Sequence, residues 1–199
     1  MIVGRFEWAE NFCLTIVNPL RTTTIISRLS YDDSCRVLQS QQLIDEGDIP
    51  PLSERPPRYD DEVLAVSFFR TELADAKLEH LTLQRTFFGR SEIRAVSFQD
   101  TDLSESTANW NDFVDVDFSS ADLSRCDFRA CLFQEVRFIG ACLVDTDFRH
   151  CSFTNCDFTG ADLTGTKFTQ ADAASLQLSS NQQRAVDWQA DDGDEPEGG

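Results

Sequence analysis

The chain has few of the residues from which catalytic and cofactor sites are built. It contains only two histidines, and its nine glycines form no phosphate-binding loop. Neither a nucleophile elbow nor a metal-ligand spacing occurs in it. No apolar run approaches the roughly 20 residues that cross a bilayer. From these absences we expect no enzyme, no cofactor, no metal ion and no membrane partner.

Basic residues are also scarce. The sequence has 17 lysines and arginines against 35 aspartates and glutamates, which gives a net charge of −18 and a pI near 4.3. This balance argues against direct binding to nucleic acid, whereas a basic protein partner is compatible with it. The first residues include Arg5, Glu7 and Glu10 and lack a clean apolar core, so we expect no signal peptide and a cytoplasmic protein.

What the chain does have is a five-residue rhythm over Val66–Gln170. Of the 21 positions taken every fifth residue over Phe68–Phe168, twelve are Phe, seven are Leu and one is Ile, and Ala108 is the exception. Two residues before each of these stands a small or β-branched residue, apart from Leu81 and Asn111. An internal repeat of this length has to be interpreted before individual helices and strands.

A period of five fits neither an α-helix nor a plain strand. It fits short extended runs separated by corners. Because residues two apart in an extended run point to the same side, the large residue and the small residue two before it point inward. Four such runs close a square coil of 20 residues, and leucines recur at that spacing, at Leu83, Leu103, Leu123, Leu143 and Leu163.

Six segments follow a stricter pattern of a small residue, Asp, then Leu or Phe. They are TDLSE (101–105), ADLSR (121–125), CDFRA (126–130), TDFRH (146–150), CDFTG (156–160) and ADLTG (161–165). This pattern resembles the pentapeptide-repeat family, and the resemblance covers 105 of the 199 residues. It implies an all-β fold, a right-handed quadrilateral β-helix. It does not fix a function, because one fold hosts many functions.

The chain before the repeat does not keep the five-residue rhythm. Residues 1–60 are expected to form a capping segment that covers the open first coil, because solenoid ends expose strand edges and apolar surface. An alternative is a specificity element for a partner. The local signals predict strands, a helix and a proline-rich linker, with the strands at Ile2–Trp8, Phe12–Val17 and Thr22–Leu29 and the helix at Cys35–Glu46.

The chain from residue 61 onward divides into three predicted parts. The β-helix is expected over residues 61–178. A capping box at Ser180–Gln183 predicts a short cap helix near Asn181–Asp187, within residues 179–190, which carries Trp188 to seal the second end. Such caps dimerise some members of the family, so a homodimer is one prediction. The acidic, glycine-rich residues 191–199 are expected to be disordered.

Seven cysteines raise the question of metal binding and disulfides. Cys126, Cys131, Cys151 and Cys156 occupy the inward small position on three different sides, so core packing explains them without metal. A disulfide between Cys131 and Cys151, one coil apart, is geometrically conceivable. We expect reduced thiols, because the cysteine count is odd and no signal peptide is recognised. Cys142 alone is expected to face outward.

The repeat sorts the outward residues onto four sides of the coil. We number these sides one to four by the central residues of the first coil, Phe68, Leu73, Leu78 and Leu83. Side one has a net charge of +3 and carries the outward aromatic residues Phe69, Phe87 and Trp110. We expect the N-terminal segment to fold back over it. Sides two, three and four have net charges of −5, −2 and −3.

One coil departs from the pattern. Ala108 leaves an inward gap, Asn111 buries an amide that needs hydrogen-bond partners, and Trp110 is expected to swing inward to fill the gap. Local strain or a slipped register is the plain interpretation, and a partner-binding bulge is the other. His80 and His150 fall at corners on opposite sides, so they cannot meet in one coil.

The family resemblance supplies the leading functional hypothesis. Several pentapeptide-repeat proteins are similar to duplex DNA in width and charge and protect type II topoisomerases from antibiotics or toxins. We therefore expect a non-enzymatic DNA mimic that binds DNA gyrase or topoisomerase IV. The alternative is an immunity or adaptor module that docks through side one and the N-terminal segment. The candidate partner-binding residues are Glu72, Asp75, Glu92, Asp112, Asp115, Glu135, Phe87 and Trp110.

Overall fold

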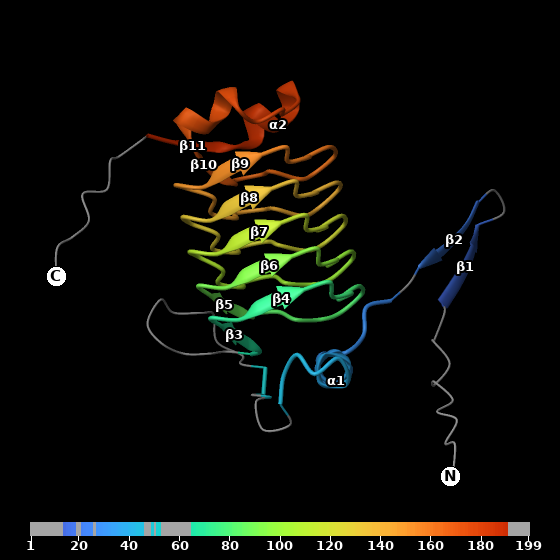
Figure 1. Ribbon diagram of the computed structural model, residues 1–199. Coiled ribbons are helices and arrows are strands. Elements are labelled where there is room, and N and C mark those ends of the chain that lie inside the picture. Colours follow the sequence, from blue (N-terminus) through green and yellow to red (C-terminus); the bar gives the residue numbers. More distant parts are fainter. Residues whose placement is uncertain are drawn as a thin grey trace, which may run out of the picture.

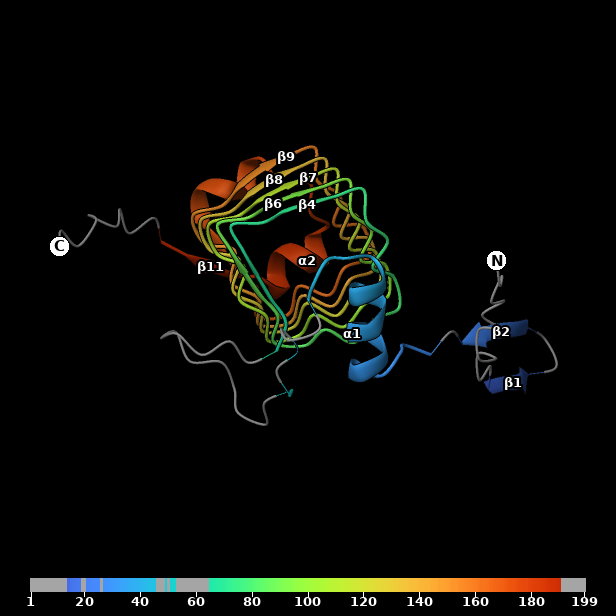
Figure 2. The same cartoon turned by 60° about the horizontal axis from the view of Figure 1, so that its bottom comes forward.

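The computed structural model describes residues 14–18, 21–25, 27–45, 49, 51–52 and 65–190. From Ala65 the chain winds into a parallel β-solenoid of about 6 turns, seen from the side in Figure 1. In Figure 2, which brings the first end of the rod toward the viewer, the coil has a four-sided outline. The solenoid predicted from the five-residue rhythm is therefore confirmed.

Side two carries the most regular strands. They form one five-stranded parallel sheet in the order β4-β6-β7-β8-β9, with the bounds Glu72–Ala74, Glu92–Arg94, Asp112–Val114, Leu132–Gln134 and Ser152–Thr154. On side one, β3 (Ser67–Phe69) pairs with β5 (Phe87–Gly89). At the far end of that side, β10 (Lys167–Thr169) pairs with β11 (Asp187–Gln189). Sides three and four are joined by isolated bridges rather than strands.

Every pairing in the solenoid joins residues that are 20 positions apart, such as Phe113 with Phe133. The irregular coil keeps this register, because Thr107 bridges Asp127 and Asp112 pairs with Leu132. A slipped register at this coil is therefore wrong. The constant register means that residues at one repeat position form a straight column along the rod.

The inward Phe residues form ladders of stacked rings. On side three, Phe98, Phe118, Phe138 and Phe158 follow one another with ring centroids 5.2, 5.5 and 4.8 Å apart. Rings on neighbouring sides meet edge to face, as Phe113 and Phe128 do at 5.6 Å. Each such pair contributes about 0.5–1.5 kcal/mol beyond the apolar area it buries. These contacts make the interior of the rod a continuous aromatic core.

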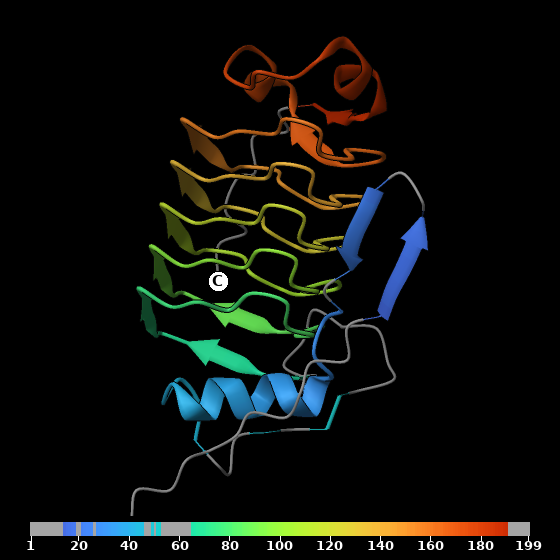
Figure 3. The ribbon, with the colours of Figure 1, turned by 90° about the vertical axis from the view of Figure 1, so that its right-hand side faces the viewer.

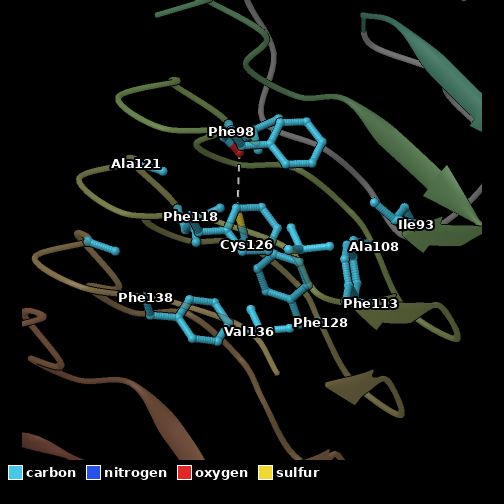
Figure 4. Packing of buried hydrophobic residues seen from close by; sticks show 14 of the residues in the cluster. Ile93, Phe98, Ala108, Phe113, Phe118, Ala121, Cys126, Phe128, Val136 and Phe138 are labelled. Atoms are coloured by element: carbon cyan, nitrogen blue, oxygen red, sulfur yellow. Dashed lines mark hydrogen bonds between the residues drawn. The ribbon is translucent and has the colours of Figure 1, made fainter. Parts of the chain in front are cut away.

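Ala108 interrupts the ring ladder of side one. It is fully buried, and Figure 4 shows it beside Ile93, Phe113 and Phe128. Trp110 does not fill this position, since its side chain is 69% exposed. The prediction that it swings inward is wrong. Trp110 is a corner residue with φ of 60°, and only the central residue and the one two before it point into the rod.

The inward small residues also connect adjacent coils by hydrogen bonds. Thr101 donates from Oγ1 to Leu78 O at 2.5 Å and accepts from Leu81 N at 3.2 Å. Asn111 makes the same two connections with its amide. Its Nδ2 donates to Phe88 O at 2.6 Å and its Oδ1 accepts from Ser91 N at 2.6 Å. The buried amide therefore has the partners that it needs.

The cysteines of the core act in the same way. Cys131 Sγ donates to Ala108 O at 2.8 Å, and Cys151 Sγ donates to Phe128 O at 2.9 Å. Burial raises the pKa of Cys131 to about 12. The cysteines that the structure describes are all free thiols, and Cys142 is partly exposed. These sulfurs are core side chains that also join coil to coil.

Helix α1 (Tyr31–Ser40) covers the first end of the rod, where it lies beneath the first coil in Figure 3 and over one edge of the coil in Figure 2. It begins four residues before the predicted Cys35 because Ser30 is the N-cap, and its side chain accepts from Asp33 N at 3.2 Å. It ends before the predicted Glu46, since Gln42 takes a left-handed φ of 58°. Cys35 and Leu38 are fully buried.

Residues 27–45 of the N-terminal segment dock onto sides three and four. Leu29 N donates to His80 O at 2.8 Å, and Thr82 N donates to Ser34 Oγ at 2.8 Å. Our expectation that the segment covers side one is therefore wrong for residues 27–45, because these hydrogen bonds join them to free backbone groups of the first coil on the other two sides. Residues 1–13 and 53–64 lie outside the described residues.

The hairpin that precedes α1 has two antiparallel strands. These are β1 (Leu14–Asn18) and β2 (Arg21–Ile25), close to the predicted Phe12–Val17 and Thr22–Leu29, although the second ends earlier. The predicted strand at Ile2–Trp8 lies outside the described residues. No helix in the described ranges has the length and apolarity needed to cross a bilayer.

The second end of the rod is closed by the 3₁₀ helix η1 (Gln170–Ala174), helix α2 (Ser180–Ala185) and β11. The capping box is present but lies one residue before the predicted one, with Ser179 as N-cap and Gln182 as its partner. The reason is that Gln182 Nε2 also donates to Phe158 O at 2.7 Å, which fixes the helix on the last coil. Trp188 lies on β11 rather than on the helix. The predicted tail, 191–199, lies outside the described residues.

Candidate protein-binding face

Seven aspartates on sides one, three and four hold turns of the repeat. In each of these, a carboxylate oxygen accepts a hydrogen bond from the backbone N–H two residues later, as in Asp102 to Ser104 N at 3.0 Å. The same bond occurs at 2.8–3.1 Å in Asp117, Asp122, Asp127, Asp147, Asp157 and Asp162. This local bonding is the usual role of Asp in a tight turn.

The electrostatics of these aspartates agree with a structural role. Burial alone would raise the pKa of Asp147, but hydrogen bonds from the side chain and backbone of Arg149 hold the pKa below its ordinary value of 3.8. Burial likewise opposes the hydrogen bonds from Ser119 and Gln99 that lower the pKa of Asp117. The folded chain therefore stabilises these carboxylates in their charged form.

Several arginines are also committed to the fold. Arg129 pairs with Asp127 at 2.9 Å, and Arg149 pairs with Asp147 at 2.8 Å, both on side one. Elsewhere, Glu105 bridges two arginines of neighbouring coils. With these two pairs set aside, the net charge of +3 on side one belongs to Arg70, Arg90 and Lys167. In the first coils of side one, no carboxylate of the described chain forms an ion pair with Arg70 or Arg90.

The carboxylates of side two are different. Glu72, Glu92 and Asp112 occupy one repeat position and lie in register, in a column along the sheet. These residues lie in extended strands rather than tight turns, and no bond to the backbone N–H two residues later forms here. Among described residues, only Glu92 has a partner, the neighbouring Arg94.

A second acidic column lies along the next corner of the coil. Asp75, Asp115 and Glu135 have left-handed φ values of 53°, 53° and 57°, and all three are exposed. Within the described part of the chain, no hydrogen bond or ion pair engages their side chains or those of Glu72 and Asp112. The six acidic candidates are therefore brought together on one face, and five of them contribute nothing visible to the fold.

An aromatic patch of Phe69, Phe87 and Trp110 borders this face. Phe69 is 54% exposed, as predicted from its outward place, whereas Phe87 is partly buried. Trp110, at 69% exposed, keeps its outward place instead of turning into the gap at Ala108. The Phe69 and Phe87 rings stack at 6.3 Å, and the guanidinium of Arg70 lies 5.2 Å from the Phe69 ring centre. Trp110 is the corner residue two positions before Asp112, so the patch adjoins side two.

Gly89 makes room for the two phenylalanine rings. A Cβ atom at this position would lie 2.5 Å from the Phe87 ring and 2.8 Å from the Phe69 ring. The sequence did not predict a binding role for Phe69, Arg70, Gly89 or Arg90. The sequence did carry a positional signal, because Phe69 stands directly after the central residue of side one, where later coils carry a glycine, an asparagine, an arginine or a threonine.

The described residues contain no group of three or more His, Cys, Asp or Glu side chains arranged to hold a metal ion. The acidic columns are open and lie on the outside of a filled rod. Their arrangement suits contact with another macromolecule through charge, rather than the enclosure of a small substrate.

Comparison with solved structures gives several similar proteins. HetL, a pentapeptide-repeat protein involved in heterocyst differentiation regulation in Nostoc sp. strain PCC 7120, is 15% identical with a TM-score of 0.49. The match covers 51% of this chain and 48% of HetL, so the chain spans about half of HetL's length. A pentapeptide-repeat protein of the Arabidopsis thaliana thylakoid lumen is 26% identical, with a TM-score of 0.30 and coverage of 57% and 72%.

The plasmid-mediated fluoroquinolone resistance protein QnrB1 is also similar. It is 16% identical with a TM-score of 0.23, and the match covers 62% of this chain and 92% of QnrB1. Comparison with curated proteins finds no match. Two family models match the chain, the pentapeptide repeat region over residues 107–188 and the pentapeptide repeats over residues 71–107. Together they span more than half of the sequence, and the chain belongs to the pentapeptide-repeat family.

Proposed function

We propose that this protein is a non-enzymatic DNA mimic that binds, through side two, the DNA-binding surface of a protein partner. The observation that carries the proposal is the division among the carboxylates. Seven aspartates on sides one, three and four bond to their own turns. None of the six acidic residues of side two does so, and all but the partly buried Glu92 are exposed in two columns. Exposed charges of one sign repel one another and do not help the fold, so a basic partner accounts for them best.

The density of these charges is close to that of a nucleic-acid strand. The six acidic residues of side two occupy four successive coils. At the ~4.8 Å spacing of strands, four coils extend over about 19 Å and present one carboxylate about every 3 Å. A single DNA strand carries one phosphate every ~3.4 Å. A protein surface built to contact phosphates would therefore meet a similar row of negative charges on side two.

The partner class to test first is a type II topoisomerase, such as DNA gyrase or topoisomerase IV. The support comes from the family resemblance and from the fluoroquinolone resistance named for QnrB1. Association of two copies through the cap formed by α2 and β11 would lengthen the acidic face, and we include such a dimer in the proposal.

The test is competition for DNA gyrase. The wild-type chain should displace duplex DNA from the enzyme, and the variant in which Glu92, Asp112 and Glu135 are replaced by lysine should not. Its loss of binding should be at least tenfold, because three attractive charges become repulsive. Wild-type protein that leaves DNA binding and supercoiling unchanged at every concentration tested would overturn gyrase as the partner.

A second candidate function is an adaptor or immunity module that docks through the aromatic patch. The exposure of Phe69 and Trp110 favours it, because large apolar side chains that are exposed near one another usually mark a contact surface. This function predicts binding that depends weakly on salt and is lost when the patch is changed. DNA mimicry predicts binding that weakens steeply as salt rises.

A further inference from the structure

We propose that the aromatic patch and the acidic columns form one binding site, in which Phe69, Phe87 and Trp110 anchor an apolar side chain of the basic partner. This inference rests on the proposed function and adds a chemical requirement to it. The partner must present a large apolar residue within a surface rich in lysine and arginine.

The patch has the features of a built surface. Phe69 lies on Phe87, and both rings occupy space that only a glycine at position 89 leaves free. Trp110 holds a left-handed backbone φ of 60° while its side chain remains 69% exposed. Arg70 and Arg90 take the same left-handed conformation in the two preceding coils, so the exposed ring, rather than the backbone, distinguishes Trp110.

The position of the patch argues for a joint site. Arg70, Arg90 and Trp110 occupy the same corner column in three successive coils, and this corner is where side one meets side two. Two residues further along each coil stand Glu72, Glu92 and Asp112. A partner that covers the carboxylates therefore also reaches the aromatic rings.

The charges around the patch determine which kind of partner side chain binds over the rings. Arg70 and Arg90 would repel a lysine or arginine placed directly over the rings, whereas the neighbouring carboxylates attract one. An uncharged, apolar side chain over the patch, with basic residues beside it, satisfies both sets of charges. Aromatic anchors of this kind dominate binding energy at protein interfaces.

Two short lysine-rich peptides test the inference, one with a central leucine and one with serine in its place. The wild-type full-length chain should bind the leucine peptide about tenfold more tightly, since the leucine is partly buried against the rings. Raising the salt concentration should weaken both peptides equally and leave this ratio unchanged, because the apolar contact does not depend on salt.

The variant with Phe69→Ser and Trp110→Asn should bind both peptides as weakly as the wild-type chain binds the serine peptide. Asparagine tolerates the left-handed corner, so the fold should be kept, which circular dichroism checks. Ile139→Ser is the matched control, because Ile139 is an exposed apolar residue on side three and is 38% exposed. It should leave the leucine preference intact.

The outcomes separate this inference from the function on which it rests. Equal, salt-dependent binding of both peptides would overturn the anchor and leave the acidic face standing. Failure of the chain to bind either peptide would overturn both. A third outcome is that the wild-type chain gains mass with concentration while the variant with Phe69→Ser and Trp110→Asn stays a monomer. That result would show that the patch binds a second copy of the chain, and it would contradict the proposed anchor.

Discussion

At the scale of single residues, aspartate has two different roles in this protein. Asp122 accepts a hydrogen bond from Ser124 N at 3.0 Å and belongs to a turn. Asp112 lies at the same position of the repeat, but on side two, and its carboxylate has no partner in the described chain. The amino acid and its repeat position are the same, so the side of the coil decides the role.

This difference predicts that replacing the aspartate by alanine has different effects at the two positions. Asp122→Ala should lower the free energy of unfolding by about 1 kcal/mol, because the turn loses one hydrogen bond. Asp112→Ala should leave stability unchanged and weaken partner binding. Urea unfolding measures the first effect and titration with the partner measures the second. Equal loss of stability in both variants would contradict the assignment.

Asn111 gives a second residue-scale prediction. Asn111→Ala should destabilise the rod by about 2–4 kcal/mol, because it leaves the buried Ser91 N–H and Phe88 carbonyl without partners. Asn111→Ser should cost less, since Ser91 makes the corresponding bonds one coil earlier, to Thr71 N and Phe68 O. Thermal unfolding of the two variants provides the comparison, and an equal loss in both would show that the bonds do not matter.

The lowered pKa of Asp147 predicts how stability depends on pH. A carboxyl whose folded pKa lies below its unfolded value of 3.8 stabilises the protein above that pH, and this contribution is lost as the pH falls through the folded pKa. Asp147→Asn should therefore be less stable than wild type at neutral pH, and the gap should narrow in acid below 3.8. Urea unfolding at a series of pH values checks this, and a constant gap would contradict it.

At the scale of elements, the two ends of the rod are closed by different means. Helix α1 buries Cys35 and Leu38 against the first coil, while α2 is fixed by polar contacts of Gln182 with the carbonyls of Phe158 and Ala161. Both helices were expected from capping residues and apolar spacing. Their true boundaries depend on contacts with the end coils, and these contacts join residues far apart in the sequence.

Gln182→Ala should loosen the second end without unfolding the rod. The substitution removes half of the capping box and two hydrogen bonds to the last coil, which should cost about 1–2 kcal/mol. Amide hydrogen exchange should rise at Gly165 and Asp187, whose N–H groups bond across this junction. Gln183→Ala is the control, because its side chain bonds only to Leu178 O within the cap. The same exchange pattern in both variants would rule out this role.

At the scale of the whole molecule, the five-residue period makes the fold and the charge map predictable together. A constant inward rhythm defines the sides, so the acidic face could be located from the sequence by counting. Two features could not be predicted from the sequence. The division between bonded and free carboxylates depends on which sides form strands and which form turns. The direction of the Trp110 side chain is the other, because its outward place in the repeat and the gap at Ala108 predict opposite directions.

The central claim is that the carboxylates of side two, rather than net charge, bind the partner. Two variants with the same net charge test it by the salt dependence of binding to gyrase. One carries Glu72→Gln, Asp112→Asn and Glu135→Gln on side two. The other carries Asp122→Asn, Asp157→Asn and Asp162→Asn, where asparagine keeps the turn acceptor.

The logarithm of the affinity should fall with the logarithm of the salt concentration for the wild-type chain, because the contacts are ionic. We predict that the side-two variant flattens this slope and that the turn variant keeps it. Equal slopes in the two variants, whether both flattened or both unchanged, would contradict the claim that side two is the binding face.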